Sequence, residues 1–166
     1  MQSDYLKYWR VVRYFIKAKY KLTQEDLDML LFLYSEKYFD KSKFKEFNNL
    51  LGWNKNRFEK LRQQQWIEVF RKGTRSRRAI YALSYKTKRV IKSIYSKLEG
   101  QEIPVSPDIN PMFLKKVSYS DKVYRNMIVK MNDFIIPALT RNKSLALNDP
   151  NSTKEVADLL FTKEGF

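Results

Sequence analysis

A basic loop, residues 71–81 with the sequence RKGTRSRRAIY, has the clearest chemistry in the chain. It places five cationic side chains around one glycine and contains no acidic residue. Lysine and arginine bind phosphate oxygens, and the planar guanidinium of arginine does so through paired hydrogen bonds. Like charges at this spacing repel each other, and an anionic partner would relieve that repulsion. We therefore expect phosphate contacts from the cations of this loop, among them Lys72, Arg75, Arg77 and Arg78.

The charge of the whole chain indicates the same kind of partner. Its 166 residues carry 33 Lys and Arg against 18 Asp and Glu, a formal net charge of +15. Between Val69 and Leu98 there are ten basic residues and no acidic ones, so the charge is concentrated in one part of the chain. A polyanion such as duplex DNA is the expected partner, with an affinity that falls steeply with salt. A solvated basic face without a ligand is the competing interpretation.

Missing residue types exclude several classes of chemistry. The chain has no cysteine and no histidine, which excludes disulfides, thiolate or imidazole metal sites and His-dependent triads. No concentrated pair of carboxylates stands out, and Tyr81 and Tyr85 are the only candidates for tyrosine chemistry near the basic loop. We expect a protein that is not an enzyme and needs no cofactor. The first residues form neither a signal peptide nor a membrane span, so we expect no membrane association and a cytoplasmic location, or packaging into a virion.

Hydrophobic spacing predicts a mainly helical fold with a small β-hairpin. Apolar residues recur at three and four positions in 4–20, and Thr23 can cap a second helix that reaches Tyr34. A third helix follows Asp40 and ends at Gly52, and Asn54 can cap a fourth over about 55–64. From Trp66 the period becomes two, so two strands are expected to flank the basic loop before Ser84 caps a helix that ends at Gly100. Most aromatic residues are expected in the core, with Trp53 the least certain.

The order of these elements resembles the multiple antibiotic resistance regulator (MarR-like) family of winged helix-turn-helix proteins, over about residues 4–100. The stretches that carry the resemblance are LTQEDLDMLLFL, FKEFNNLLGWNKNRFEKL, WIEVFRKGTRSRRAIYALS and YKTKRVIKSIYSKLEG. The resemblance implies a homodimer joined by N- and C-terminal helices, with one helix in the major groove of DNA and a wing near the minor groove. The absence of Cys and His excludes sensing of oxidants or metals through those residues, and it leaves open a small aromatic effector between the helices.

By position, the resemblance also implies individual DNA contacts. The residues on the recognition helix would be Lys55, Asn56, Arg57 and Lys60, of which Arg suits guanine edges and Asn suits adenine. Ser42 and Lys43 would meet a phosphate where the preceding helix begins. Residues 73–78 would form the wing, which adds Thr74 and Ser76 to its cations. An exposed helix surface without a ligand is the alternative for the recognition-helix residues.

Three departures from the family pattern bear on function. The segment from Gly52 to Ile67 looks about one helical turn shorter than is usual, which weakens base reading by the recognition helix. Gln65 stands where the family has a glycine, and the acidic residue common in the family's wing is missing. Without that acid, the wing arginines have no evident internal partner and are more available to phosphates.

The last third of the chain predicts an extension. Pro104, Pro107 and Pro111 indicate a linker over 101–111 between a winged domain, residues 1–100, and a helical region, residues 112–166. A helix beginning near Ser118 carries an apolar stripe from Val123 to Ile135, with Pro137 expected to end or kink it. This stripe is either an association surface or part of a core. A short final segment follows a break at residues 148–153.

The sequence leaves two functions open. The first is a dimeric MarR-like transcriptional regulator that binds double-stranded DNA, favoured by the layout of the elements. The second is an architectural or virion-associated protein that uses a winged helix for non-specific nucleic-acid or protein contacts. The shortened recognition helix and the surplus positive charge favour this second function.

Overall fold

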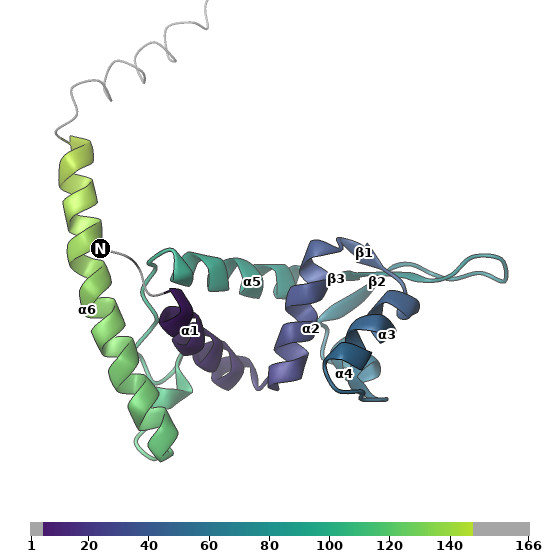
Figure 1. Ribbon diagram of the computed structural model, residues 1–166, viewed down its shortest axis with the longest axis horizontal. Helices are drawn as coiled ribbons and strands as arrows, with labels where there is room; N and C mark the ends of the chain where they lie inside the picture. Colours follow the sequence, from purple (N-terminus) through teal and green to yellow (C-terminus); the bar gives the residue numbers. More distant parts are fainter. Residues whose placement is uncertain (1–4, 148–166) are drawn as a thin grey trace, which may run out of the picture.

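The computed structural model describes residues 5–147, and the side chains of residues 5–133. The fold is mainly helical with a small antiparallel sheet, as the hydrophobic spacing predicts, and its arrangement is compatible with a winged helix (Figure 1). The helices are α1 (Tyr5–Tyr20), α2 (Gln24–Ser35), α3 (Lys41–Leu50), α4 (Arg57–Gln63), α5 (Tyr85–Leu98) and α6 (Tyr119–Leu147), with a 3₁₀ turn, η1, at Pro111–Phe113. The strands are β1 (Tyr38–Phe39), β2 (Ile67–Arg71) and β3 (Ile80–Leu83).

The helix boundaries follow from the capping residues. Thr23 Oγ1 accepts a hydrogen bond from the Asp26 amide at the start of α2, and Ser84 Oγ accepts one from the Thr87 amide at the start of α5. Both caps were predicted. Asp40 caps α3 in the same way, and Gly52 follows this helix with φ of +80°, a left-handed conformation that favours glycine.

The sheet has three strands in the order β1-β3-β2, whereas the sequence predicts only the hairpin of β2 and β3. Strand β1 pairs with β3 through Tyr38 opposite Ala82, and its two residues are too few to show an alternating pattern. On the other side of β3, Val69 lies opposite Tyr81 and Arg71 lies opposite Ile80. Phe70 is therefore an extra residue in β2, a β-bulge.

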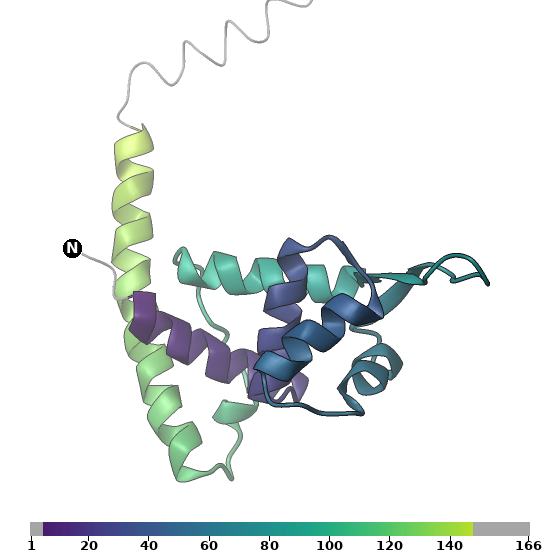
Figure 2. The same ribbon diagram turned by 45° about the vertical axis from the view of Figure 1, so that its right-hand side comes forward.

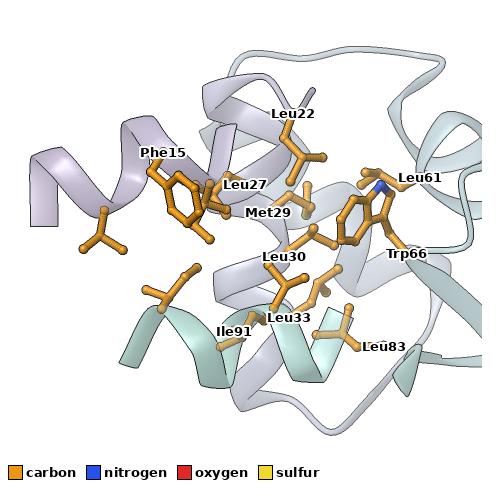
Figure 3. Close-up of a cluster of buried hydrophobic side chains, with 14 of the residues drawn as sticks. Phe15, Leu22, Leu27, Met29, Leu30, Leu33, Leu61, Trp66, Leu83 and Ile91 are labelled. Carbon is orange, nitrogen blue, oxygen red and sulfur yellow. The ribbon is translucent and has the colours of Figure 1, made fainter. Parts of the chain in front are cut away.

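Within the described part of the chain, one hydrophobic core joins the sheet to the helices around it. Figure 3 shows the centre of this core, where Phe15 of α1, Leu30 of α2 and Ile91 of α5 lie among the labelled side chains. Trp66 is 2% exposed and lies in the core beside Leu61 of α4. The prediction that Trp66 is a core residue is confirmed.

The C-terminal region packs on the same core. Asn132 of α6 bonds both backbone groups of Ile103, accepting from its amide at 3.1 Å and donating to its carbonyl at 2.9 Å. Residues 101–111, expected to be a linker, thus contribute the buried Ile103 and Asn110. Met131 of the predicted apolar stripe is buried in the core, together with Ile128, which the predicted stripe did not include. Val123 and Met127 of the stripe are exposed.

Helix α6 continues through Pro137 to Leu147, so the proline does not end it. Its first half packs against α1 and η1, while its second half extends past the other described elements in both views (Figures 1 and 2). The side chains of Phe134 and Ile135 and the predicted final segment lie outside the described residues.

Candidate nucleic-acid interface

The turn between α3 and α4 holds two of the predicted contacts. Asn54 Oδ1 accepts a hydrogen bond from the Asn56 amide at 2.9 Å, and the Asn54 carbonyl accepts one from the Arg57 amide at 3.4 Å. This local turn delays the helix, so that α4 begins at Arg57 rather than at Lys55. Lys55 and Asn56 are therefore exposed residues of the turn.

Arg57 faces the interior, and its predicted exposure on the recognition helix is wrong. The residue is 4% exposed, and its Nη1 donates to Asn48 Oδ1 and, at 3.1 Å, to the Gly52 carbonyl. Its Nε lies 3.5 Å from Asp26 Oδ1. Because Asn48 lies near the end of α3 and Gly52 begins the turn, the guanidinium fixes how the two helices of the motif meet. It is not available to a base edge.

Lys60 is partly engaged by the same carboxylate. Its Nζ lies 2.5 Å from Asp26 Oδ2, and its side chain is 40% exposed. Asp26 belongs to the first turn of α2, so this buried acid links α2 to α4 through two cations. The sequence shows Asp26 as part of a helix start, but nothing in its spacing indicates partners more than thirty residues away.

The outer face of α4 offers few free donors. Glu59 pairs with Arg62 at 3.1 Å and with Lys41 of α3 at 3.8 Å. An acid on this face repels phosphates, and its ion pairs occupy neighbouring cations. The helix itself has seven residues and is shorter than the helix expected over about 55–64.

The structure extends the predicted wing of residues 73–78 to residues 71–78, from the last residue of β2 to the loop before β3, and all of these residues are exposed. At its tip, Thr74 and Arg77 exchange backbone hydrogen bonds of 2.8 and 3.3 Å, which leaves Arg75 and Ser76 at the turn. A Cβ at Gly73 would lie 2.9 Å from the Ala79 amide nitrogen, so the two arms approach too closely for a side chain there. The loop projects well beyond the body in both views (Figures 1 and 2).

Asp40 supplies a partner that the wing sequence lacks. Its Oδ2 lies 3.2 Å from Arg78 Nη1, so the expectation that the wing arginines have no internal partner is wrong for Arg78. The hydrogen bond from the Lys43 amide, and then the bond from Arg78, lower the pKa of the Asp40 carboxyl. Arg78 remains 80% exposed. Asp40 is recognisable in the sequence as the cap of α3. Its contact with Arg78 could not be predicted, because strand β1, which directly precedes Asp40, was not predicted.

Ser42 and Lys43 lie at the predicted place, the first turn of α3. Ser42 is exposed and lines a cleft of about 400 Å³ together with Lys41 and Arg78, which brings the start of α3 next to the base of the wing. Lys43 is half-buried, and its Nζ pairs with Glu46 at 3.2 Å. Of these two residues, Ser42 is the more accessible to a phosphate.

Several aromatic residues expected in the core lie at the surface instead. Trp53 is 65% exposed in the turn, at the edge of a pocket of about 330 Å³ that Lys45 and Lys55 also line. The other exposed rings among the described residues are Tyr5, Phe32, Tyr38, Phe70, Tyr85, Tyr95 and Tyr119. Tyr38 lies on a strand that was not predicted, and Phe70 lies in a bulge, so a simple period could not place either ring.

Comparison of the chain with protein-family models, curated proteins and solved structures gave no match. Within residues 5–147, no helix combines the length and the apolar character that crossing a bilayer requires. The same part of the chain contains no cluster of acidic residues that could hold a metal ion.

Proposed function

We propose that this chain binds double-stranded DNA, with the wing as its main contact, and acts as a dimeric transcriptional regulator of the MarR-like kind. The observation that carries the proposal is the wing itself. Eight consecutive exposed residues include five cations, and of these five only Arg78 forms an ion pair with a described acid. An extended loop of this charge fits the phosphates beside a groove, where arginine also favours the negative potential of a narrow minor groove.

The turn before α4 adds a second set of contacts. Lys55 and Asn56 are exposed there, and Ser42 lies at the start of α3 near the base of the wing. Arg57 holds the turn in place, and the charge of Lys60 is partly neutralised by its ion pair with Asp26. This distribution favours backbone contacts over base reading, because the buried guanidinium cannot reach guanine.

A second copy of the chain is the proposed partner of α1 and α6. Leu6 is 83% exposed on α1, and Val123 and Met127 are 36% and 37% exposed on α6. These two helices pack against each other, so their exposed apolar side chains can form one surface. A dimer would present two wings to the duplex and double the number of phosphate contacts.

The test is a fluorescence anisotropy titration of a duplex at several salt concentrations. Roughly six to eight phosphate contacts per subunit correspond to a log-log slope of roughly −5 to −7 per subunit. Replacing Lys72, Arg75 and Arg77 with Ala should reduce the slope by about one for each phosphate that these side chains neutralise. The matched control replaces Lys115, Lys116 and Lys122, which are also exposed, and should leave the slope nearly unchanged. Equal slopes for the wing variant and the wild type would contradict the proposal.

An architectural or virion-associated protein is the second candidate. The observation that favours it is the outer face of α4, where Glu59 is engaged by Arg62 and Lys41 and leaves little for base recognition. The same titration with random and selected duplexes distinguishes the two functions. A regulator should prefer a selected sequence by about a thousandfold or more, whereas a ratio near one identifies the architectural function.

A further inference from the structure

A second basic surface lies between the end of α2, the sheet and the first half of α5. It is a cleft of about 580 Å³, here called the tyrosine cleft, with Leu33 and Leu83 among its apolar lining residues. The wing, α3 and α4 contribute no residue to it. The proposed duplex contacts therefore do not account for this surface.

Two of the three tyrosines that line the cleft are open to solvent, whereas the third, Tyr34, is half-buried against the core. Tyr85 is 74% exposed, and Tyr38 is 53% exposed. Tyr38 also contacts Phe70, itself 60% exposed, with ring centroids 4.3 Å apart, so the aromatic surface continues onto the bulge of β2. Aromatic side chains usually contribute to a fold by burying apolar surface, and these exposed rings do not. A flat ligand stacked on the rings would bury that surface.

The charged lining of this cleft is entirely basic. Among the described residues, its four cations are Lys37, Lys88, Arg89 and Lys92, and no acidic residue lines it. None of these four forms an ion pair with a described acid, in contrast to Lys41, Lys43 and Arg62 on the helix-turn-helix. The Arg89 guanidinium lies 5.9 Å from the centre of the Tyr85 ring, which places charge and aromatic surface side by side.

We propose that the tyrosine cleft binds single-stranded nucleic acid. Unpaired bases expose flat faces that stack on tyrosine rings, while the backbone supplies phosphates to the surrounding cations. A duplex does not fit this surface as well, because its bases are already stacked on one another. An acidic peptide would satisfy the lysines but offers no matching rings to the exposed tyrosines. The proposed function in duplex binding is separate and uses different residues.

The first experiment measures binding of fluorescein-labelled dT15 and rU15 to the full chain by anisotropy. The variant Tyr85→Ser/Lys88→Ser removes one exposed ring and one charge from the cleft. Its control, Tyr119→Ser/Lys122→Ser, removes the same two groups from the start of α6, where Tyr119 is 82% exposed. We expect the cleft variant to bind at least about fivefold more weakly than the control, since removal of a base stack alone has this effect. An equal decrease in affinity for the two variants would overturn the proposal.

The second experiment separates stacking from charge. Tyr85→Phe keeps the ring, so it should bind dT15 nearly as well as the wild type, whereas Tyr85→Ser should not. Inorganic polyphosphate and poly-glutamate of matched charge should displace dT15 poorly. If either displaces it as well as an unlabelled oligonucleotide, the cleft recognises charge alone and the proposal fails. Comparison of dU15 with rU15, which differ only in the sugar, shows which sugar is preferred.

The two proposed surfaces can fail independently. The variant with Lys72, Arg75 and Arg77 replaced by Ala should weaken duplex binding and largely keep dT15 binding. If the wing variant loses both ligands and the cleft variant loses neither, single strands bind the wing and the cleft proposal is wrong. If the wing variant keeps both while the cleft variant loses dT15, the cleft proposal stands and the proposed duplex function is wrong.

Discussion

Arg57 and Asp26 form an ion pair in the interior of the helix-turn-helix, with Arg57 Nε 3.5 Å from Asp26 Oδ1 and the two side chains 5% and 3% exposed. The pair joins α4 to α2, and the same guanidinium donates to Asn48 near the end of α3. A residue whose type and place in the chain indicate base recognition thus has a structural role. The three helices of the motif depend on one buried carboxylate.

Replacing Asp26 with Asn should therefore destabilise the protein strongly. The substitution keeps the size of the side chain but leaves the buried Arg57 without its counter-charge, which typically costs about 3 to 5 kcal/mol. The free energy of unfolding in urea measures the effect. Asp28→Asn is the control, because Asp28 is half-buried on the same helix and bonds only Gln24 among the described residues. A decrease for Asp26→Asn no larger than for Asp28→Asn would show that the buried pair is unimportant.

The elements that the sequence predicted correctly are those with strong local signals. Thr23 and Ser84 cap their helices as expected, and Gly52 has the left-handed conformation expected of a glycine after a helix. These features depend on residues within one turn of each other. Trp66 lies in the core, as expected for most of the aromatic residues.

The elements that the sequence missed depend on distant partners. Strand β1 exists because Tyr38 pairs with Ala82, more than forty residues away. Arg57 is buried because Asp26 lies opposite it, and a cation on a helix is otherwise expected to face solvent. At the candidate site, the five wing cations were placed correctly at the surface, but the partner of Arg78 was hidden in an unpredicted junction.

Replacing Gly73 with Ala should weaken duplex binding with little effect on global stability. The new Cβ would lie 2.9 Å from the Ala79 backbone nitrogen, so the arms of the wing must separate and its tip must move. Anisotropy titration should show a several-fold decrease in duplex affinity, while the urea midpoint stays close to that of the wild type. Ser76→Ala at the exposed tip is the control and should have a smaller effect. Unchanged affinity for the Gly73 variant would mean that the shape of the wing does not matter for binding.

Replacing Asp40 with Asn should strengthen duplex binding. The amide keeps the ability to cap α3 but removes a negative charge from the base of the wing, which releases Arg78 for a phosphate. The effect should be largest at low salt because it is electrostatic. Asp108→Asn removes an equal charge at an exposed position of the segment before η1 and serves as the control. Equal gains for both variants would attribute the effect to net charge rather than to Arg78.

The capping role of Asp40 gives a separate prediction with a definite pH dependence. Asp40→Ala removes the hydrogen bond to the Lys43 amide and should reduce the free energy of unfolding by about 1 kcal/mol at neutral pH. The bond from Lys43, and then that from Arg78, lower the pKa of this carboxyl in the folded state. Its contribution is therefore present above the unfolded value of about 3.9 and is lost as the pH falls through the lowered folded value. Urea titrations at pH 7 and near pH 3 should show the gap between variant and wild type narrowing in acid; a constant gap contradicts the role of the charge.

Replacing Lys97 with Met should stabilise the protein. The lysine is 6% exposed, its Nζ bonds only Ser93 among the described residues, and burial, with a smaller effect from Lys19, lowers its pKa. Methionine fills a similar space and carries no charge to desolvate, so the urea midpoint should rise at pH 7. Because burial lowers the pKa of Lys97 in the folded state, the cost of burying the charged ammonium group is fully present below that lowered pKa. This cost disappears as the pH rises from the lowered pKa toward the ordinary lysine value of about 10.4. The stability advantage of Lys97→Met should therefore shrink over this pH range.

Lys92→Met, at an exposed position of the same helix, controls for the change in helix propensity and net charge, and it should leave the urea midpoint nearly unchanged. If both variants raise the midpoint equally, the gain comes from relief of general repulsion among the basic residues of α5, since the exposed Lys92 has no burial cost to relieve. If Lys97→Met lowers the midpoint, the Nζ bond to Ser93 and its contact with the Phe15 ring, 5.9 Å from the ring centre, outweigh the cost of burying the ammonium group.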